Sequence, residues 1–373
     1  MLRIAFKFIL FDKPKSIGAL AGAVISIFLI GQQLGIFIFL TNAMGSLVRN
    51  NQQYIWVVDE TTTNVNALAP LDIRIGRELE SIPGVNRAYP WVISGASARF
   101  ENGKTFGVQL IGSQAPGFHG GPWNLAAGTK EDLIPEGALI TEYFDQKNLG
   151  DAKIGDYFEV NGKKVYIAGQ TRGVRSFGGV YAFTTLERAR ALTGFSTNKV
   201  SAFLVEWDPN FSTAQTVTNI NGAIKGVRAW DPKEFTTETV TTVLKSSGIA
   251  LSVGTLIVFA LISGFVIIGL TLYSAAIDRI RDYGTLKAIG ATNAYVRNLI
   301  LTQATIFSVL GFAIGYTFVE GFRSGVAQAG TFFSFPLWMQ AGMFLVTLMI
   351  AVAGSFFAIT RISKLEPAAV FRG

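Results

Sequence analysis

Four long apolar segments constrain the fold of this 373-residue chain more than any other feature. They cover roughly residues 17–40, 249–275, 299–319 and 340–359, and each approaches or exceeds the ~20 apolar residues that a helical membrane span requires. The composition agrees, because 50% of the residues are hydrophobic and 15% are charged, whereas soluble domains carry about 25% charged residues. The sequence therefore predicts a membrane protein with four transmembrane helices.

The distribution of basic residues sets the expected orientation of these spans. Three segments outside the spans hold most of the basic residues near the membrane, namely Arg3, Lys7, Lys13, Lys15, then Arg279, Arg281, Lys287, Arg297, then Arg361, Lys364 and Arg372. The loop between the third and fourth spans has only Arg323. Basic residues concentrate in cytoplasmic loops, so we expect both termini in the cytoplasm and the large domain outside it. The net charge of +7 then requires no nucleic acid as a partner.

About two hundred residues of mixed polar and apolar sequence separate the first two spans, which is the size of one or two soluble domains. Asn102-Gly103 and Asn161-Gly162 each lie between two strand-like runs and predict β-hairpins. We expect helices at 47–57, 72–81, 186–192, 213–224 and 232–245, and strands at 85–93 and 201–207. The predicted fold class is therefore membrane α-helical, with a mixed α/β extracytoplasmic domain inserted between transmembrane helices 1 and 2.

Residues 1–16 are expected to form an amphipathic segment on the cytoplasmic surface of the lipid membrane. Leu2, Ile4 and Phe8 are set against Arg3 and Lys7 at helical spacing, which is typical of an interfacial helix. A basic flank that only sets the topology explains the same residues equally well. The apolar stretch that follows is too long for the core of a cleavable signal peptide and is interpreted as the first span.

Signals for catalysis or cofactor binding are weak. The chain has no cysteine and one histidine, His119, in a glycine-rich loop, where a packing role is expected. Gly103-Lys104-Thr105 resembles the end of a phosphate-binding loop, but Ala98 stands where the first glycine belongs, and a hairpin turn explains the string. We expect no catalytic residue, metal site or cofactor in this chain. The span centres lack charged residues, which disfavours an ion-coupled carrier.

The charged segment at residues 276–292, between the second and third spans, carries the strongest functional signal. A charged side chain at the bilayer centre costs about 2.5–3.5 kcal/mol, so this segment must leave the membrane. Gly284 and Gly290 are expected to break the helix on either side of a short amphipathic run, and Thr292 or Asn293 can cap the next helix. A cytoplasmic partner could dock here; a capped interfacial turn without a partner is the alternative.

Residues 278–291 have the sequence Asp-Arg-Ile-Arg-Asp-Tyr-Gly-Thr-Leu-Lys-Ala-Ile-Gly-Ala. This resembles the motif Glu-Arg-x-x-Glu-Ile-Gly-x-Leu-x-Ala-x-Gly-Ala, which follows the second span in permease subunits of MacB/FtsX-type ABC transporters, the mechanotransmission or type VII class. Asp278 and Asp282 replace glutamate, and Tyr283 replaces an aliphatic residue. Residues 362–372 are similar to the family's closing Leu-Asp-Pro-Ala-x-x-Leu-Arg, and residues 32–36 are most similar to the DevC-like branch.

The resemblance implies a homodimeric permease that is not itself an enzyme. A separate dimer of ABC ATPase subunits would bind ATP and Mg²⁺, and a periplasmic adaptor and an outer-membrane channel are further implied partners. The implied work is export of a hydrophobic or lipid-like substrate from the bacterial inner membrane. The alternatives are extraction of lipoproteins or lipids and activation of a periplasmic cell-wall hydrolase. The residues implied in ATPase coupling are Asp278, Arg279, Arg281, Asp282, Gly284, Leu286, Lys287, Ala288, Gly290 and Ala291.

Gly311 and Gly315, one helical turn apart in the third span, are expected to allow close helix packing. The predicted organisation in chain order is a cytoplasmic amphipathic segment at 1–16, transmembrane helix 1 at 17–43 extending outward as a stalk, a periplasmic α/β domain at 44–245, transmembrane helix 2 at 246–277, a cytoplasmic coupling loop at 278–297, transmembrane helix 3 at 298–320, a short periplasmic loop at 321–339, transmembrane helix 4 at 340–360, and a cytoplasmic tail at 361–373.

Overall fold

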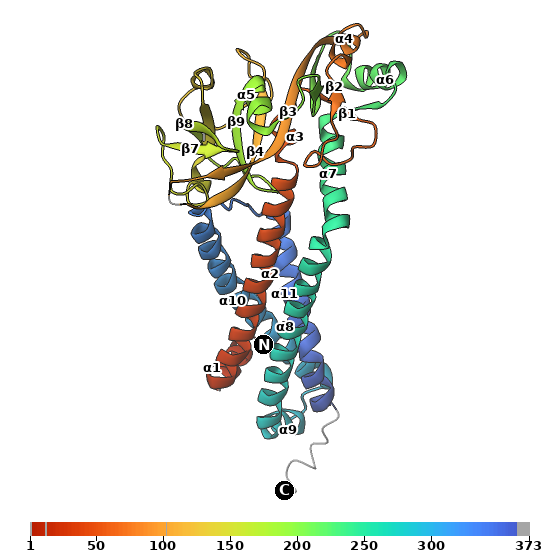
Figure 1. The fold of residues 1–373 in the computed structure, drawn as a ribbon. Helices are drawn as coiled ribbons and strands as arrows, with labels where there is room; N and C mark the ends of the chain where they lie inside the picture. The colour runs from red at the N-terminus through yellow and green to blue at the C-terminus, as the bar shows by residue number, and fades with distance from the viewer. Residues whose placement is uncertain (1, 12, 102, 364–373) are drawn as a thin grey trace. The chain divides into compact units, whose positions relative to one another are not determined.

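The computed structural model describes residues 2–11, 13–101 and 103–363 (Figure 1). The chain divides into two compact units. The first unit consists of residues 1–38, 249–328 and 332–373, and the second of residues 39–248 and 329–331. The expected fold class is confirmed, because apolar helices of spanning length flank a mixed α/β unit that is inserted between the first and second of them.

The first unit is helical. Its elements are α1 (Leu2–Phe11), α2 (Lys13–Met44, which continues into the second unit), α8 (Ile249–Asp278), α9 (Ile280–Ala288), α10 (Asn293–Ala327) and α11 (Leu337–Ser363). Within the described residues, four helices are long and apolar enough to cross a membrane: Ser16–Met44, Ile249–Asp278, Asn293–Ala327 and Leu337–Ser363. α11 packs along both α8 and α10, so these helices form a bundle.

Glycines bring neighbouring helices of the bundle into close contact. A Cβ atom added at Gly269 of α8 would lie 3.4 Å from the Cα of Gly354 in α11, and one added at Gly354 would lie 3.0 Å from the backbone nitrogen of Gly269. Gly311 and Gly315 of α10 lie against Ala23 and Ile27 of α2, where an added Cβ would be 2.5 Å and 2.9 Å from the Cβ atoms of these residues. A side chain at Gly354, Gly311 or Gly315 would therefore have to displace its neighbour, whereas one at Gly269 would make an ordinary contact.

The second unit is built on a ten-stranded sheet with the order β12-β1-β11-β3-β4-β9-β6-β8-β5, in which β7 pairs with β3 and β8. Most pairs are antiparallel, while β4–β9 and β6–β8 are parallel. The strands are β1 (Ile55–Asp59), β3 (Val85–Arg99), β4 (Thr105–Ser113), β5 (Leu125–Ala127), β6 (Ala138–Glu142), β7 (Tyr157–Val160), β8 (Lys163–Thr171), β9 (Val180–Thr185), β11 (Ala202–Trp207) and β12 (Val227–Trp230); β2 (Leu71–Asp72) and β10 (Lys199–Val200) form a separate pair. Both predicted hairpins are confirmed, as β3–β4 and β7–β8.

The helical segments of this unit are α3 (Ser46–Arg49), α4 (Ile75–Glu80), η1 (Lys130–Leu133), η2 (Tyr143–Asp145), α5 (Leu186–Thr193), α6 (Thr213–Ala223) and α7 (Pro232–Ser247). The helix predicted at 47–57 is wrong beyond Arg49, because residues 55–59 form the buried strand β1 between β11 and β12. The helix predicted at 72–81 is confined to α4. The strand predicted at 85–93 continues to Arg99, because its residues from Trp91 to Arg99 pair with β4.

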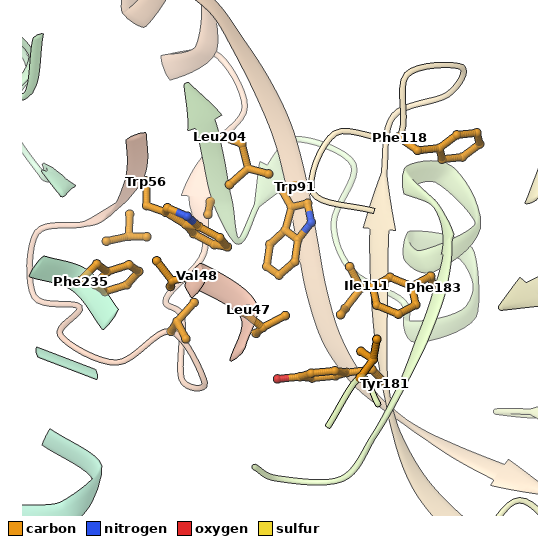
Figure 2. Packing of buried hydrophobic residues seen from close by; sticks show 14 of the residues in the cluster. Leu47, Val48, Trp56, Trp91, Ile111, Phe118, Tyr181, Phe183, Leu204 and Phe235 are labelled. Carbon is orange, nitrogen blue, oxygen red and sulfur yellow. The ribbon is translucent and has the colours of Figure 1, made fainter. Parts of the chain in front are cut away.

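A buried aromatic core joins the sheet to the two helices that adjoin the spans (Figure 2). Leu47 and Val48 of α3 and Phe235 of α7 pack with Trp56 of β1 and Trp91 of β3. The ring centroids of Trp56 and Trp91 lie 5.4 Å apart in a T-shaped arrangement, and those of Trp56 and Phe235 lie 6.0 Å apart. Large aromatic side chains bury much apolar surface and prefer such edge-to-face geometry, so this core fixes α3 and α7 to the sheet.

The contact between α8 and α11 generates the first prediction. Replacing Gly354 with valine is expected to cost about 1–3 kcal/mol, because the new side chain must displace the backbone of α8. The measurement is thermal unfolding of the full chain in detergent micelles. Gly342→Val is the matched control, since Gly342 lies in the same helix and no atom lies within 4 Å of a Cβ there. Equal melting temperatures for the two variants would contradict the assigned contact.

Candidate functional site

The charged segment between the second and third spans forms the short helix α9 rather than a loop. α8 ends at Asp278, and α9 ends before Gly290, whose φ of +103° suits a residue without a side chain. The hydroxyl of Thr292 then accepts a hydrogen bond from the backbone N–H of Tyr295 at 3.2 Å and caps α10. Of the two residues predicted as this cap, Thr292 is confirmed. The prediction that Gly284 breaks the helix is wrong, because Gly284 lies buried within α9.

One face of α9 is buried against the bundle. Tyr283 is 2% exposed and belongs to a hydrophobic cluster with Ala5 of α1, Ala276 of α8, Leu299 of α10 and Ile362 of α11. Burial raises the pKa of Tyr283 to about 12, so this phenol stays neutral. Tyr283, one of the three residues that depart from the family motif, thus packs α9 into a cluster with four other helices of the unit.

Arg279 also lies on the buried side, with 9% of its surface exposed. The central carbon of its guanidinium lies 4.7 Å from the centroid of the Phe11 ring at the end of α1. This is the geometry of a cation–π interaction. α1 packs in addition against α10, so the N-terminal helix is part of the structure around α9.

Lys287 links α9 to the end of α11. Its Nζ donates hydrogen bonds to the backbone carbonyls of Ile362 at 2.9 Å and Ser363 at 3.1 Å. Carbonyls in the last turn of a helix have no intrahelical partners and carry partial negative charge, so a cation stabilises them. Desolvation lowers the pKa of this lysine.

The opposite face of α9 is exposed. Of the ten residues implied in ATPase coupling, this face carries Arg281, Asp282 and Ala288, and Asp278 before α9 and Gly290 after it are exposed as well. Arg279 and Gly284 are buried, and Leu286, Lys287 and Ala291 are partly buried. Two further residues on the exposed face are absent from that set, Thr285 and Ile289. Ile289 is 77% exposed. Its place directly before Gly290, where the helix ends, is a signal in the sequence that could have added it to the set.

His119 lies outside this region, in the second unit, and packs between two tyrosines. Its Nδ1 lies 2.8 Å from the Tyr54 hydroxyl, and its ring stacks on Tyr89 with centroids 3.6 Å apart. The Tyr89 hydroxyl donates to Glu206 at 2.8 Å. Burial lowers the pKa of His119. Among the described residues, no group of three or more His, Asp and Glu side chains could hold a metal ion.

Part of the helical unit matches a known protein family. Residues 254–367 match the family model of the FtsX-like permease C-terminal region. The predicted resemblance is thereby confirmed for FtsX-like permeases, whereas the DevC-like branch stays a prediction. Of the C-terminal residues 362–372 that are similar to the family's closing motif, 364–372 lie outside the part of the chain that the structure describes. No curated protein sequence matches the chain.

Several solved structures are similar to part of the chain. The extracellular domain of the transporter YknZ from Gram-positive bacteria is 14% identical, with a TM-score of 0.35, over 48% of this chain and 98% of that one. The periplasmic region of MacB from Actinobacillus actinomycetemcomitans is 10% identical, with a TM-score of 0.38, over 54% and 98%. A permease domain from Porphyromonas gingivalis is 15% identical, with a TM-score of 0.34, over 48% and 89%. With TM-scores below 0.5, these likenesses carry no further argument.

The contact of Lys287 with α11 generates the second prediction. Lys287→Met is expected to remove about 0.3–1 kcal/mol from the last turn of α11, because its carbonyls lose their cation. Amide hydrogen exchange should become faster at the C-terminal end of α11 and stay unchanged at its start. Lys287→Arg keeps the charge and is the matched control. If exchange in Lys287→Met equals that of the parent chain, the link has no energetic role.

The His119 cluster generates the third prediction. Because burial lowers the pKa of His119 below its usual value of about 6.5, the folded state favours neutral imidazole. The associated stability is present above that pH and is lost as the pH falls toward the lower, folded-state pKa. Nuclear magnetic resonance of histidine-labelled protein should give one imidazole signal. Its midpoint should lie below that of the same chain in denaturant; an equal or higher midpoint would contradict the assignment.

Proposed function

We propose that this chain, whose residues 254–367 are an FtsX-like permease C-terminal region, is the transmembrane subunit of an ABC transporter on which a separate ATPase subunit docks at α9. In this proposal the ATPase activity, ATP and Mg²⁺ belong to the partner. The observation that carries the proposal is the division of α9 into two faces, one buried through Tyr283 and one exposed with Arg281, Asp282 and Ile289.

The chemistry of the exposed face suits a protein partner. Arg281 and Asp282 offer adjacent charges of opposite sign, which give orientation and specificity in an interface. Ile289 offers an apolar contact that a partner would remove from water. Arg281, Asp282 and Ile289 are all exposed, so one partner surface would meet both the charges and the apolar side chain.

In this proposal, Tyr283 and Lys287 transmit a force from the docked ATPase to the membrane-spanning helices. A close-packed cluster resists compression and transmits strain, so a force on the exposed face is not absorbed by α9 alone. It reaches α8 and α10 through the cluster around Tyr283, and it reaches α11 through the two hydrogen bonds of Lys287. ATP hydrolysis in the partner would in this way change the arrangement of the spans.

The finer part of the proposal concerns location and partners. The chain would lie in the bacterial inner membrane with both termini in the cytoplasm, which the basic residues around α9 support. Two copies would bind an ATPase dimer, and the second unit would act on a periplasmic adaptor and an outer-membrane channel. The proposed work is export of a hydrophobic or lipid-like substrate. The absence of charged residues from the span centres supports mechanical coupling over ion-coupled transport.

The fourth prediction tests docking on the exposed face of α9. The double variant Arg281→Glu, Asp282→Lys inverts both charges, and Ile289→Asp removes the apolar contact. Each is expected to weaken binding of the co-expressed ATPase at least about tenfold, equivalent to ~1.4 kcal/mol. Co-purification from detergent measures the binding.

The control for this experiment is Arg361→Glu, because Arg361 is exposed near the end of α11 and outside α9. It should leave ATPase binding unchanged. Arg279 is not used, because its burial against Phe11 means that a change would disturb the packing of α1. Undiminished ATPase binding by both exposed-face variants would refute the proposed function.

A further inference from the structure

A buried carboxylate lies where two parallel strands of the second unit end. Glu142 is the last residue of β6, and Thr171 is the last residue of β8, which pairs with β6 in parallel. The Glu142 carboxylate is fully buried and accepts hydrogen bonds from the Thr171 hydroxyl at 2.7 Å and from the backbone N–H groups of Gly173 at 2.7 Å, Val174 at 2.9 Å and Phe144 at 3.3 Å. It therefore fixes the start of the β8–β9 loop to the C-terminal ends of β6 and β8.

The same loop carries half of a largely buried ion pair. The Arg175 guanidinium lies 2.8 Å from the carboxylate of Asp145 in η2, and their side chains are 23% and 5% exposed. Burial raises the pKa of Asp145, and Arg175 opposes that shift. Removing one partner from such a pair leaves an uncompensated buried charge and is strongly destabilising locally. Glu142, Asp145 and Arg175 thus hold β6, η2 and the loop together; these three residues are named the loop joint.

Two segments that continue into membrane-spanning helices contact the loop joint or Phe144, which lies between Glu142 and Asp145 in the chain. The hydroxyl of Ser46 donates a hydrogen bond to the Arg175 carbonyl at 2.8 Å, and Ser46 lies two residues after α2 ends at Met44. Gly330, in the connection between α10 and α11, lies against Phe144 of η2, where an added Cβ would be 2.5 Å from the Phe144 Cβ. Ser46 and Gly330 both belong to the second unit, so these contacts lie within one compact body.

The joint is held together by charged groups and touches two segments near the ends of the spans. An ion pair joins Asp145 to Arg175, and four hydrogen bonds hold the Glu142 carboxylate. The Ser46 hydroxyl binds the Arg175 carbonyl, and Gly330 lies against Phe144, whose backbone N–H donates to Glu142. A displacement at the end of α2 or in the α10–α11 connection would therefore move β6 and the β8–β9 loop together, instead of deforming the loop.

We infer that the loop joint is the element through which the ends of the spans position the β6–β8 part of the second unit; this inference rests on the proposed function. Arg175 and Asp145 act as positioning residues. They touch no substrate, and their role is to convert a shift of Ser46 and Gly330 into a shift of the strands that follow them in the sheet.

Distance measurements between spin labels test this inference. The chain has no cysteine, so Glu136→Cys and Lys233→Cys introduce the only labelling sites in the full chain. Residue 136 is exposed just before β6, and residue 233 is exposed at the start of α7. The labelled chain is measured alone and with the co-purified ATPase, with and without ATP, in lipid nanodiscs.

We expect a sharp distance distribution in the parent chain and an ATP-dependent shift with the ATPase. Arg175→Met should broaden the distribution without nucleotide and abolish the shift, while ATPase binding is retained. Arg175→Lys keeps the charge and should restore both. Arg74→Met is the matched control, because it removes an arginine from an exposed ion pair with Asp72 and should change neither readout.

The two readouts keep the failure of this inference separate from the failure of the proposed function. If the ATPase does not co-purify with the parent chain, the proposed function fails, and the nucleotide-free distributions still decide the inference. A distribution in Arg175→Met as sharp as in the parent chain, or an ATP-dependent shift that persists in that variant, would overturn the role of the loop joint. Broadening reversed by Arg175→Lys supports it.

Discussion

The packing of α3 and α7 into one aromatic core is the interaction on which the rest of the second unit depends. α3 follows the first span and α7 precedes the second, and both contribute side chains to the cluster around Trp56 and Trp91 (Figure 2). β1, β3 and β11 contribute to the same cluster, so the central strands and the two connecting helices share buried surface. Close-packed interiors have few arrangements available to them, so the sheet and these helices behave as one body.

In the helical unit, α9 has to meet two requirements. Its charged residues must stay in water, and the helix must be held firmly if a partner is to act on it. Tyr283 meets the second requirement by burial, and Lys287 meets it by binding the carbonyls at the end of α11. The close approach of helices at glycines such as Gly269 and Gly354 means that a movement of one helix displaces the next.

The sequence predicted the number of spans, both hairpins, the inserted α/β unit and the place of the charged segment. These features depend on local properties: apolar length, turn residues and the cost of charge in lipid. Prediction failed at residues 55–59, because β1 is made by pairing with β11 and β12, which are distant in sequence. It failed at Gly284 as well, since a glycine in a buried helix turn is stabilised by its neighbours and need not break the helix.

The sequence by itself therefore determined the class of the protein and the resemblance of residues 254–367 to FtsX-like permeases, because membrane-length apolar runs and a spaced motif are properties of short segments. Only the tertiary structure decided which residues of that motif face outward and which hold α9 in place. It also brought Glu142, Asp145 and Arg175 together from two separated stretches of chain. Burial and contact across such distances are products of packing, and no local pattern in the sequence records them.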